Sequence, residues 1–134
     1  MTGIIIAGHG HFAGGMISAV ELIAGTLTHL ECVEFCQGQD IGEFKHNMTQ
    51  AIKSLDTEDI LLMADILGGS PFNVAMQLLM EGTKKNLKVV AGVNMAAVIH
   101  AVFSRETVSF EELSNQVLEA GKEGLVDSSA LMPE

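Results

Sequence analysis

Tryptophan and tyrosine are absent from this sequence, and phenylalanine occurs only six times. A hydrophobic core must therefore be built mainly from Ile, Leu, Val, Met and Ala, and apolar residues make up 48% of the chain. The 134 residues are enough for one compact domain. Because no low-complexity linker or charge block divides them, we predict that residues 1–134 form a single domain.

Basic residues are scarce as well. Seven Lys and Arg stand against 17 Asp and Glu, which gives a formal net charge of −10 at pH 7. A nucleic-acid binder neutralises phosphates with Lys and Arg, so this balance argues against a nucleic-acid partner. It is compatible with a basic protein partner.

A long apolar run and a set of paired cysteines are also missing. No stretch reaches the ~20 apolar residues that span a bilayer, so we expect no membrane insertion. The N-terminus lacks the basic region and small-residue cleavage site of a signal peptide. The two cysteines, Cys32 and Cys36, show no disulfide pattern and fit a reducing compartment. We therefore expect a cytoplasmic protein.

What the sequence does contain is a regular alternation of short apolar runs and longer stretches with helical spacing. The predicted strands are 4–7, 30–36, 60–64 and 87–91. The predicted helices are 12–23, 44–52, 71–81 with Ser70 as N-cap, 95–103, and a fifth helix from 110 that follows a capping-box signature at Ser109 and Glu112. Strands that alternate with helices indicate a parallel sheet with helices on both faces.

The order of the strands can also be predicted. The run 30–36 alternates with Glu31 and Glu34, which is typical of a half-exposed strand at a sheet edge. A flavodoxin-like three-layer sandwich with strand order 2-1-3-4 puts this strand at the edge. That order also places the carboxyl ends of strands 1 and 3 side by side, where open α/β sheets bind their ligands.

His9 and Asp65 follow these two neighbouring strands directly, His9 between Gly8 and Gly10. The flanking glycines leave room for another protein to approach the imidazole. A carboxylate that accepts a hydrogen bond from one ring nitrogen fixes the tautomer and leaves the other lone pair free to attack. The alternatives are a solvated loop histidine and an aspartate that only caps a turn.

The segment Gly68-Gly69-Ser70-Pro71 precedes a helix and is the most distinctive local signal. Its free backbone N–H groups and the positive helix end suit a phosphoryl group, and the Ser70 hydroxyl adds a donor. The segment lacks the lysine of a P-loop, and its place in the chain does not fit a dinucleotide fingerprint. An ordinary glycine-rich turn is the alternative interpretation.

A metal site is the less favoured interpretation of the histidines and cysteines. His9 and His11 are two residues apart, and the spacing of Cys32 and Cys36 is not that of a structural zinc site. We therefore expect no metal and no cofactor. His11 is expected to point to solvent, although it could instead tune the charge of the site.

In combination, Gly8-His9-Gly10, Asp65 with Gly68-Gly69-Ser70-Pro71-Phe72-Asn73, and Ala91-Gly92-Val93-Asn94 resemble the mannose-family IIA proteins of the bacterial sugar phosphotransferase system, or PTS. The resemblance covers nearly the whole chain. It implies a cytoplasmic phosphocarrier that takes a phosphoryl group from HPr and passes it to a IIB component. It also implies that His9 is phosphorylated at Nε2, that Asp65 is its partner carboxylate, and that Gly68, Gly69 and Ser70 face the phosphate.

The resemblance further implies a homodimer, in which a C-terminal strand, here 125–132, is exchanged and runs antiparallel to the sheet. A carrier that serves two proteins needs an exposed histidine with an apolar rim, for which Phe12, Leu67 and Phe72 are the candidates. Two other functions stay open at this point. One is a flavodoxin-like module that senses an anion without a covalent step, and the other is a histidine-dependent phosphatase or mutase.

Overall fold

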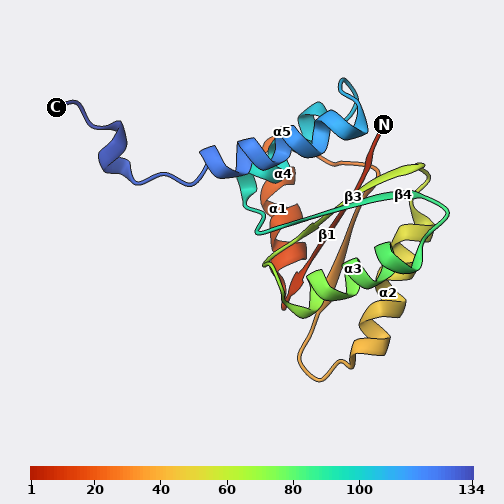
Figure 1. The fold of residues 1–134 in the computed structure, drawn as a ribbon. Helices are drawn as coiled ribbons and strands as arrows, with labels where there is room; N and C mark the ends of the chain where they lie inside the picture. The colour runs from red at the N-terminus through yellow and green to blue at the C-terminus, as the bar shows by residue number, and fades with distance from the viewer.

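The fold is organised around a four-stranded parallel sheet in the order β2-β1-β3-β4 (Figure 1). The computed structural model describes all residues, 1–134. The strands are β1 Gly3–His9, β2 Leu30–Phe35, β3 Asp59–Ala64 and β4 Asn86–Ala91. In the central register, Ile6 lies opposite Cys32 on one side and Met63 on the other. The predicted class and strand order are confirmed.

Five helices cover the two faces of the sheet: α1 Phe12–Ala24, α2 Ile41–Ser54, α3 Ser70–Glu81, α4 Met95–Ser104 and α5 Phe110–Glu123. Helices α1, α4 and α5 pack on one face, and α2 and α3 on the other (Figure 1). Each face has its own apolar cluster, and together they give the three layers that were predicted. None of these helices is long and apolar enough to cross a membrane.

The burial of each strand agrees with its position in the sheet. Ile4, Ile5 and Ile6 are fully buried, because successive side chains of a central strand enter the two opposite apolar layers. In β2, by contrast, Glu31 and Cys32 are exposed and Val33 is buried. The polar residues of β2 are tolerated because β2 has a neighbour on one side only, as predicted.

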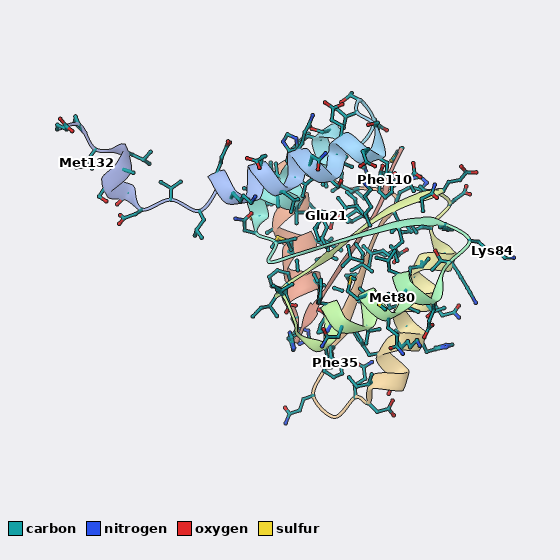
Figure 2. All side chains as sticks on the ribbon, in the orientation of Figure 1. Glu21, Phe35, Met80, Lys84, Phe110 and Met132 are labelled. Carbon is teal, nitrogen blue, oxygen red and sulfur yellow. The ribbon has the colours of Figure 1, made fainter.

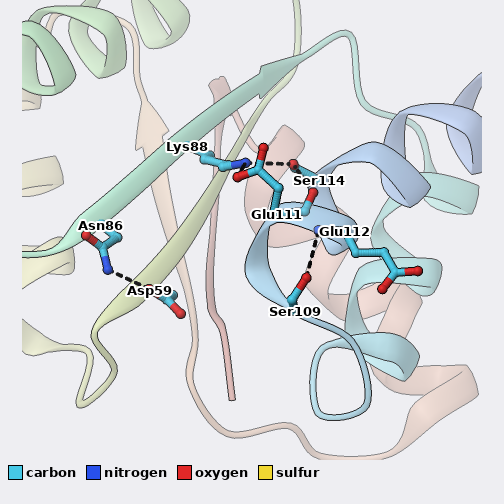
Figure 3. Close-up of polar contacts among 7 residues, drawn as sticks. All are labelled: Asp59, Asn86, Lys88, Ser109, Glu111, Glu112 and Ser114. Atoms are coloured by element: carbon cyan, nitrogen blue, oxygen red, sulfur yellow. Dashed lines mark hydrogen bonds and ion pairs between the residues drawn. The ribbon is translucent and has the colours of Figure 1, made fainter.

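The N-cap of α5 agrees with the sequence-based prediction, whereas the N-cap of α3 differs from it. Asp40 caps α2 by accepting the Glu43 N–H at 2.7 Å, and Ser109 caps α5 by accepting the Glu112 N–H at 3.1 Å (Figure 3). The prediction that Ser70 caps α3 is wrong. Ser70 is the first helical residue, and the extended Gly69 is the N-cap without a side-chain hydrogen bond.

The apolar residues of α3 are not all buried. Val74, Ala75 and Leu78 are buried, whereas Leu79 is 37% exposed and Met80 is 81% exposed (Figure 2). Each residue turns the helix by ~100°, so Leu79 and Met80 fall progressively outside a stripe centred on Ala75 and Leu78. Their side chains therefore face away from the sheet.

Helix α5 is tied to strand β4 through Lys88. The Nζ of Lys88 lies 2.9 Å from Oε2 of Glu111 and 3.3 Å from Oγ of Ser114 (Figure 3). The same ammonium lies 5.3 Å from the centroid of the Phe110 ring, within range of a cation–π contact. These contacts fix the start of α5 beside the outer strand.

The residues after α5 extend away from the body of the molecule (Figure 1). Residues 124–134 are exposed, and their only regular element is a short 3₁₀ helix, Ser128–Leu131. The segment 125–132 forms no strand within this chain, and the sheet has four strands only.

Arg105 is the buried cation of the fold, and we expect it to be important for stability. Its Nη1 and Nη2 donate to the carbonyls of His29 and Thr28 at 3.0 and 2.6 Å, which holds the loop before β2, where His29 has a φ of 53°. Burial lowers the pKa of this guanidinium, while Glu106 acts in the opposite direction. Arg105→Met should lower the free energy of unfolding by about 1–3 kcal/mol in urea titrations, because it removes both bonds. Arg105→Lys should recover part of the loss; a Met variant as stable as the parent would contradict this role.

Candidate functional site

The structure brings His9 and Asp65 together at the carboxyl edge of the sheet. The two residues end or follow the adjacent strands β1 and β3, and Nδ1 of His9 lies 2.8 Å from Oδ2 of Asp65. The same oxygen accepts the backbone N–H of His9 at 2.9 Å, and Oδ1 accepts the N–H of Ile66 at 2.9 Å. An ionised carboxylate can only accept hydrogen bonds, so Nδ1 carries the ring proton. The lone pair of the neutral ring is then on Nε2.

The two members of the pair differ in exposure. The His9 side chain is 50% exposed, whereas the Asp65 side chain is 12% exposed. A partner molecule can therefore reach the imidazole, while the carboxylate is largely shielded by protein. Such a partly buried, charge-assisted hydrogen bond is stronger than one in open water.

The loop before α3 lies directly against the imidazole. A Cβ added at Gly69 would be 2.8 Å from Cε1 and 3.5 Å from Nε2 of His9. Any larger residue at position 69 would therefore collide with the ring beside its nucleophilic nitrogen. Glycine is required here by close approach rather than by its φ, which is −77°.

The glycines beside His9 have different roles. A Cβ at Gly8 would lie 2.7 Å from Cδ1 of Phe12 and 3.1 Å from Cβ of Asp65. The space beside Gly8 is thus filled by the protein itself, which corrects the expectation that both glycines make room for a partner. A Cβ added at Gly10 would meet no other residue within 4 Å, and the φ of Gly10 is 56°, so this glycine permits both a left-handed turn and an approach from outside.

The segment 68–70 presents the start of α3 to the site. Gly68 has a φ of 82°, and its carbonyl accepts a hydrogen bond from the side chain of Asn73 at 3.0 Å. Because no side chain caps α3, the first amides of the helix keep free donor capacity. With Gly69 against His9, this positive helix end lies beside the ring and suits an anionic group.

The other side chains considered as metal ligands do not come together in the structure. The structure contains no group of three or more His, Cys, Asp or Glu side chains that could hold a metal ion. Cys32 and Cys36 are free and exposed. Burial, followed by the charges of Glu34 and Glu31, raises the pKa of the Cys32 thiol, which makes it a poor nucleophile.

Comparison with known proteins identifies the family. Residues 3–118 match the EIIA-man family model, described as the PTS system fructose IIA component. The chain belongs to the EIIA-man family. Proteins of this kind are phosphotransferase components of sugar PTS systems, which agrees with the resemblance inferred from the motifs.

Individual relatives support this membership of the EIIA-man family. The chain is 30% identical over 118 residues to the PTS system fructose-specific EIIA component of Bacillus subtilis, covering 87% of this chain and 80% of the relative. A crystal structure of the phosphotransferase system component EIIA from Streptococcus agalactiae superimposes with a TM-score of 0.90 at 35% identity, covering 97% and 99% of the two chains.

A longer relative is the PTS system mannose-specific EIIAB component of Escherichia coli K12. The identity is 29% over 124 residues, or 91% of this chain. This EIIA-man chain spans only 38% of the length of that relative.

Two features of this EIIA-man site were not predicted. Phe35, at the end of β2 (Figure 2), lies opposite His9 in the β1–β2 register, and its ring centroid is 6.1 Å from that of His9 in an edge arrangement. The His11 side chain is 88% exposed, as expected, but its Nδ1 also lies 3.3 Å from the carboxylate of Glu34. Both contacts join residues far apart in the sequence and depend on the register between β1 and β2. The edge-strand pattern predicted that Glu34 and Phe35 lie on the strand beside β1, but it did not predict which residues face each other.

The expected apolar rim is only partly present. Leu67 is 73% exposed and its neighbour Ile66 is 55% exposed, on the loop that leads from Asp65 to α3. Phe12 and Phe72 are half-buried instead, since they lie in the first turns of helices that pack on the sheet. The exposed apolar surface beside the imidazole is thus supplied by the loop after β3.

Proposed function

We propose that this chain is a phosphocarrier of a sugar PTS, acting as a single IIA domain in the cytoplasm. In this proposal, Nε2 of His9 accepts a phosphoryl group from phospho-HPr and passes it to a IIB component. The observation that carries the proposal is the 2.8 Å contact between Nδ1 of His9 and Asp65, which leaves Nε2 as the free nucleophile on a half-exposed ring. Membership of the EIIA-man family supports the same assignment.

The proposed step conserves atoms and charge. The lone pair on Nε2 of His9 attacks phosphorus, a new N–P bond forms, and the bond from phosphorus to the donor's histidine breaks. The His9 ring keeps its proton on Nδ1 and becomes positively charged, and Asp65 stabilises that charge. Because one phosphohistidine replaces another, the step needs positioning and electrostatic stabilisation more than further chemistry, and no metal or nucleotide takes part.

The proposed role of Gly68, Gly69 and Ser70 is to hold the oxygens of the phosphoryl group. Gly69 lies against the ring edge that bears Nε2, so a group on that nitrogen would meet the amides at the start of α3. Backbone donors suit a carrier in particular, since they stabilise the group without trapping it as a buried lysine or arginine would.

The direct test is phosphorylation of the purified chain. It is incubated with phosphoenolpyruvate, HPr and the enzyme that loads HPr, and intact-mass spectrometry then looks for the gain of one acid-labile phosphoryl group. A purified IIB protein should remove that group on addition. Saturable phosphate binding without a covalent adduct would instead favour the anion-sensing alternative.

We further propose that the chain is a homodimer in which the C-terminal segment 125–132 is exchanged. Leu125, Leu131 and Met132 are 85%, 76% and 69% exposed on a segment that touches little of its own chain. One edge of β4 has no partner strand. Beside the end of this strand lies a cavity of about 250 Å³ lined by residues including Val93, Leu118 and Leu125.

Removal of residues 125–134 should therefore convert a dimer into a monomer. The exposed apolar residues of this segment can be buried only against another molecule, and a second copy offers the open edge of β4. Light scattering after size exclusion measures the change, and a Ser128→Ala, Ser129→Ala variant is the matched control that keeps the dimer. If the chain 1–134 is monomeric at micromolar concentration, the exchange is ruled out.

A further inference from the structure

A second histidine–carboxylate pair lies at the end of β1, and the proposed transfer step does not use it. Nδ1 of His11 is 3.3 Å from both carboxylate oxygens of Glu34. The His11 side chain is 88% exposed and that of Glu34 is 26% exposed. Glu34 belongs to β2 and lies opposite Gly8, the residue before His9.

Glu34 has a structural reason to be there, because it caps α1 from the neighbouring strand. The N-cap residue of α1, His11, makes no capping hydrogen bond, and the first turn contains no acidic residue. Instead Oε2 of Glu34 accepts the N–H of Gly14 at 3.3 Å. A Cβ at Gly14 would lie 2.8 Å from that oxygen, so the glycine leaves room for the carboxylate. A negative group at a helix N-terminus is favourable.

This cap creates an electrostatic problem for a phosphoryl carrier. Glu34 lies opposite Gly8, and His9 is the next residue, so the two side chains project from opposite faces at the same edge of the sheet. With neighbouring strands ~4.8 Å apart, the Glu34 carboxylate and the His9 ring are then on the order of 10 Å apart. A phosphoryl group arriving at His9 carries further negative charge, and salt screens repulsion over this distance only in part. No Lys or Arg side chain forms an ion pair with Glu34. Lys45 pairs with Glu81, Lys88 with Glu111 and Lys122 with Glu119, and Arg105 binds backbone carbonyls.

We propose that His11 is the counter-charge of Glu34: its protonated ring cancels the charge of the helix cap while a phosphoryl group is carried on His9. The groups that face His11 are the Glu34 carboxylate from β2 and, through it, the Gly14 amide of α1. Asp65 is engaged with His9. When the His11 ring carries a proton on both nitrogens, its Nδ1–H faces the Glu34 carboxylate and the two groups form an ion pair. The inference rests on the proposed function.

Three variants separate a counter-charge from a merely structural role. His11→Gln should slow phosphoryl transfer onto His9 by about threefold to tenfold, the effect of one unneutralised charge across roughly 10 Å. Glu34→Gln keeps a side-chain carbonyl for the Gly14 N–H and should transfer at least as fast as the parent protein. The double variant should return to the rate of Glu34→Gln, because the repelling charge is then gone.

The rates are measured under single-turnover conditions with two donors, phospho-HPr and the small molecule phosphoramidate. The small donor reports the electrostatics of the site without protein docking. Both donors should show the loss in His11→Gln at low salt, and high salt should reduce it. His46→Gln, at an exposed histidine of α2, is the matched control with an unchanged rate, and melting temperatures check the fold.

The outcomes distinguish the two levels of the proposal. If the unsubstituted chain takes no phosphoryl group from phospho-HPr, the proposed function fails and this inference fails with it. If the chain is labelled but His11→Gln matches it at low salt, the inference alone is wrong. A double variant as slow as His11→Gln, or a loss confined to the protein donor, would also overturn the counter-charge role.

Discussion

We expect His9→Gln to abolish phosphoryl acceptance, so that no adduct is detectable by intact mass after incubation with phosphoenolpyruvate and the HPr system. Glutamine has an amide nitrogen whose lone pair is delocalised, so no nucleophile is left at this position. The fold should survive, because the side chain is half-exposed at the end of β1 and its backbone N–H can still bond to Asp65. Circular dichroism and the melting temperature check this point.

The controls for His9→Gln are the other histidines near and far from the site. His46→Gln should take up one phosphoryl group at the parent rate, and His11→Gln should reach the same final amount more slowly. Acid lability of the adduct identifies a phosphoramidate rather than a phosphoester. An acid-labile adduct of equal amount on the His9→Gln protein would move the acceptor to another residue and refute the assignment.

The sequence predicts much of this fold because burial and polarity vary in regular ways along the chain. The uninterrupted run Ile4–Ile6 is typical of a strand covered on both faces, and Glu31 with Glu34 is typical of an edge strand. Both patterns agree with a flavodoxin-like order, in which strand 2 lies at the edge beside strand 1. Each connection between successive strands is long enough to hold a helix, so the strands that it joins run parallel.

The details that escaped prediction depend on contacts between distant segments. Ser70 has the chemistry of an N-cap, but Gly69 takes that position because the loop packs against the His9 ring. Glu34 looked like a solvent-facing edge residue, yet it caps a helix that starts 22 residues earlier in the chain. Local propensity cannot reveal either contact, since both follow from the strand register.

The pairing of His9 with Asp65 lies between these two cases. The strand order brings the ends of β1 and β3 together, so their proximity could be predicted from the pattern alone. Which oxygen meets which nitrogen could not, and the structure adds that one carboxylate oxygen binds both the ring Nδ1 and the backbone N–H of His9. This double contact restrains the ring as well as its tautomer.

Asp65→Asn is expected to have the second-largest effect, slowing transfer onto His9 by about 10²- to 10⁴-fold. The upper end corresponds to the loss of roughly 10⁴ when the carboxylate that orients the histidine of a serine-protease triad is replaced by its amide. The amide can turn its NH₂ toward Nδ1, which then accepts a hydrogen bond and moves the ring proton to Nε2. The nucleophilic lone pair is lost in that tautomer. The positive ring that forms on phosphorylation also loses its counter-charge, which adds to the barrier.

The measurement for Asp65→Asn is the single-turnover rate from phospho-HPr, with Asp59→Asn as the matched control. Asp59 is a carboxylate at the start of β3, at the opposite end of the strand from Asp65, where Oδ1 accepts a hydrogen bond from Asn86 at 2.8 Å (Figure 3). Its replacement should leave transfer unchanged. Because the amide oxygen introduced by Asp65→Asn can still accept the backbone N–H of Ile66, the variant should fold, so a slow rate reports the ring and not the loop. An Asp65→Asn rate equal to that of the parent would mean that neither the charge of the carboxylate nor the ring tautomer that it selects contributes to transfer.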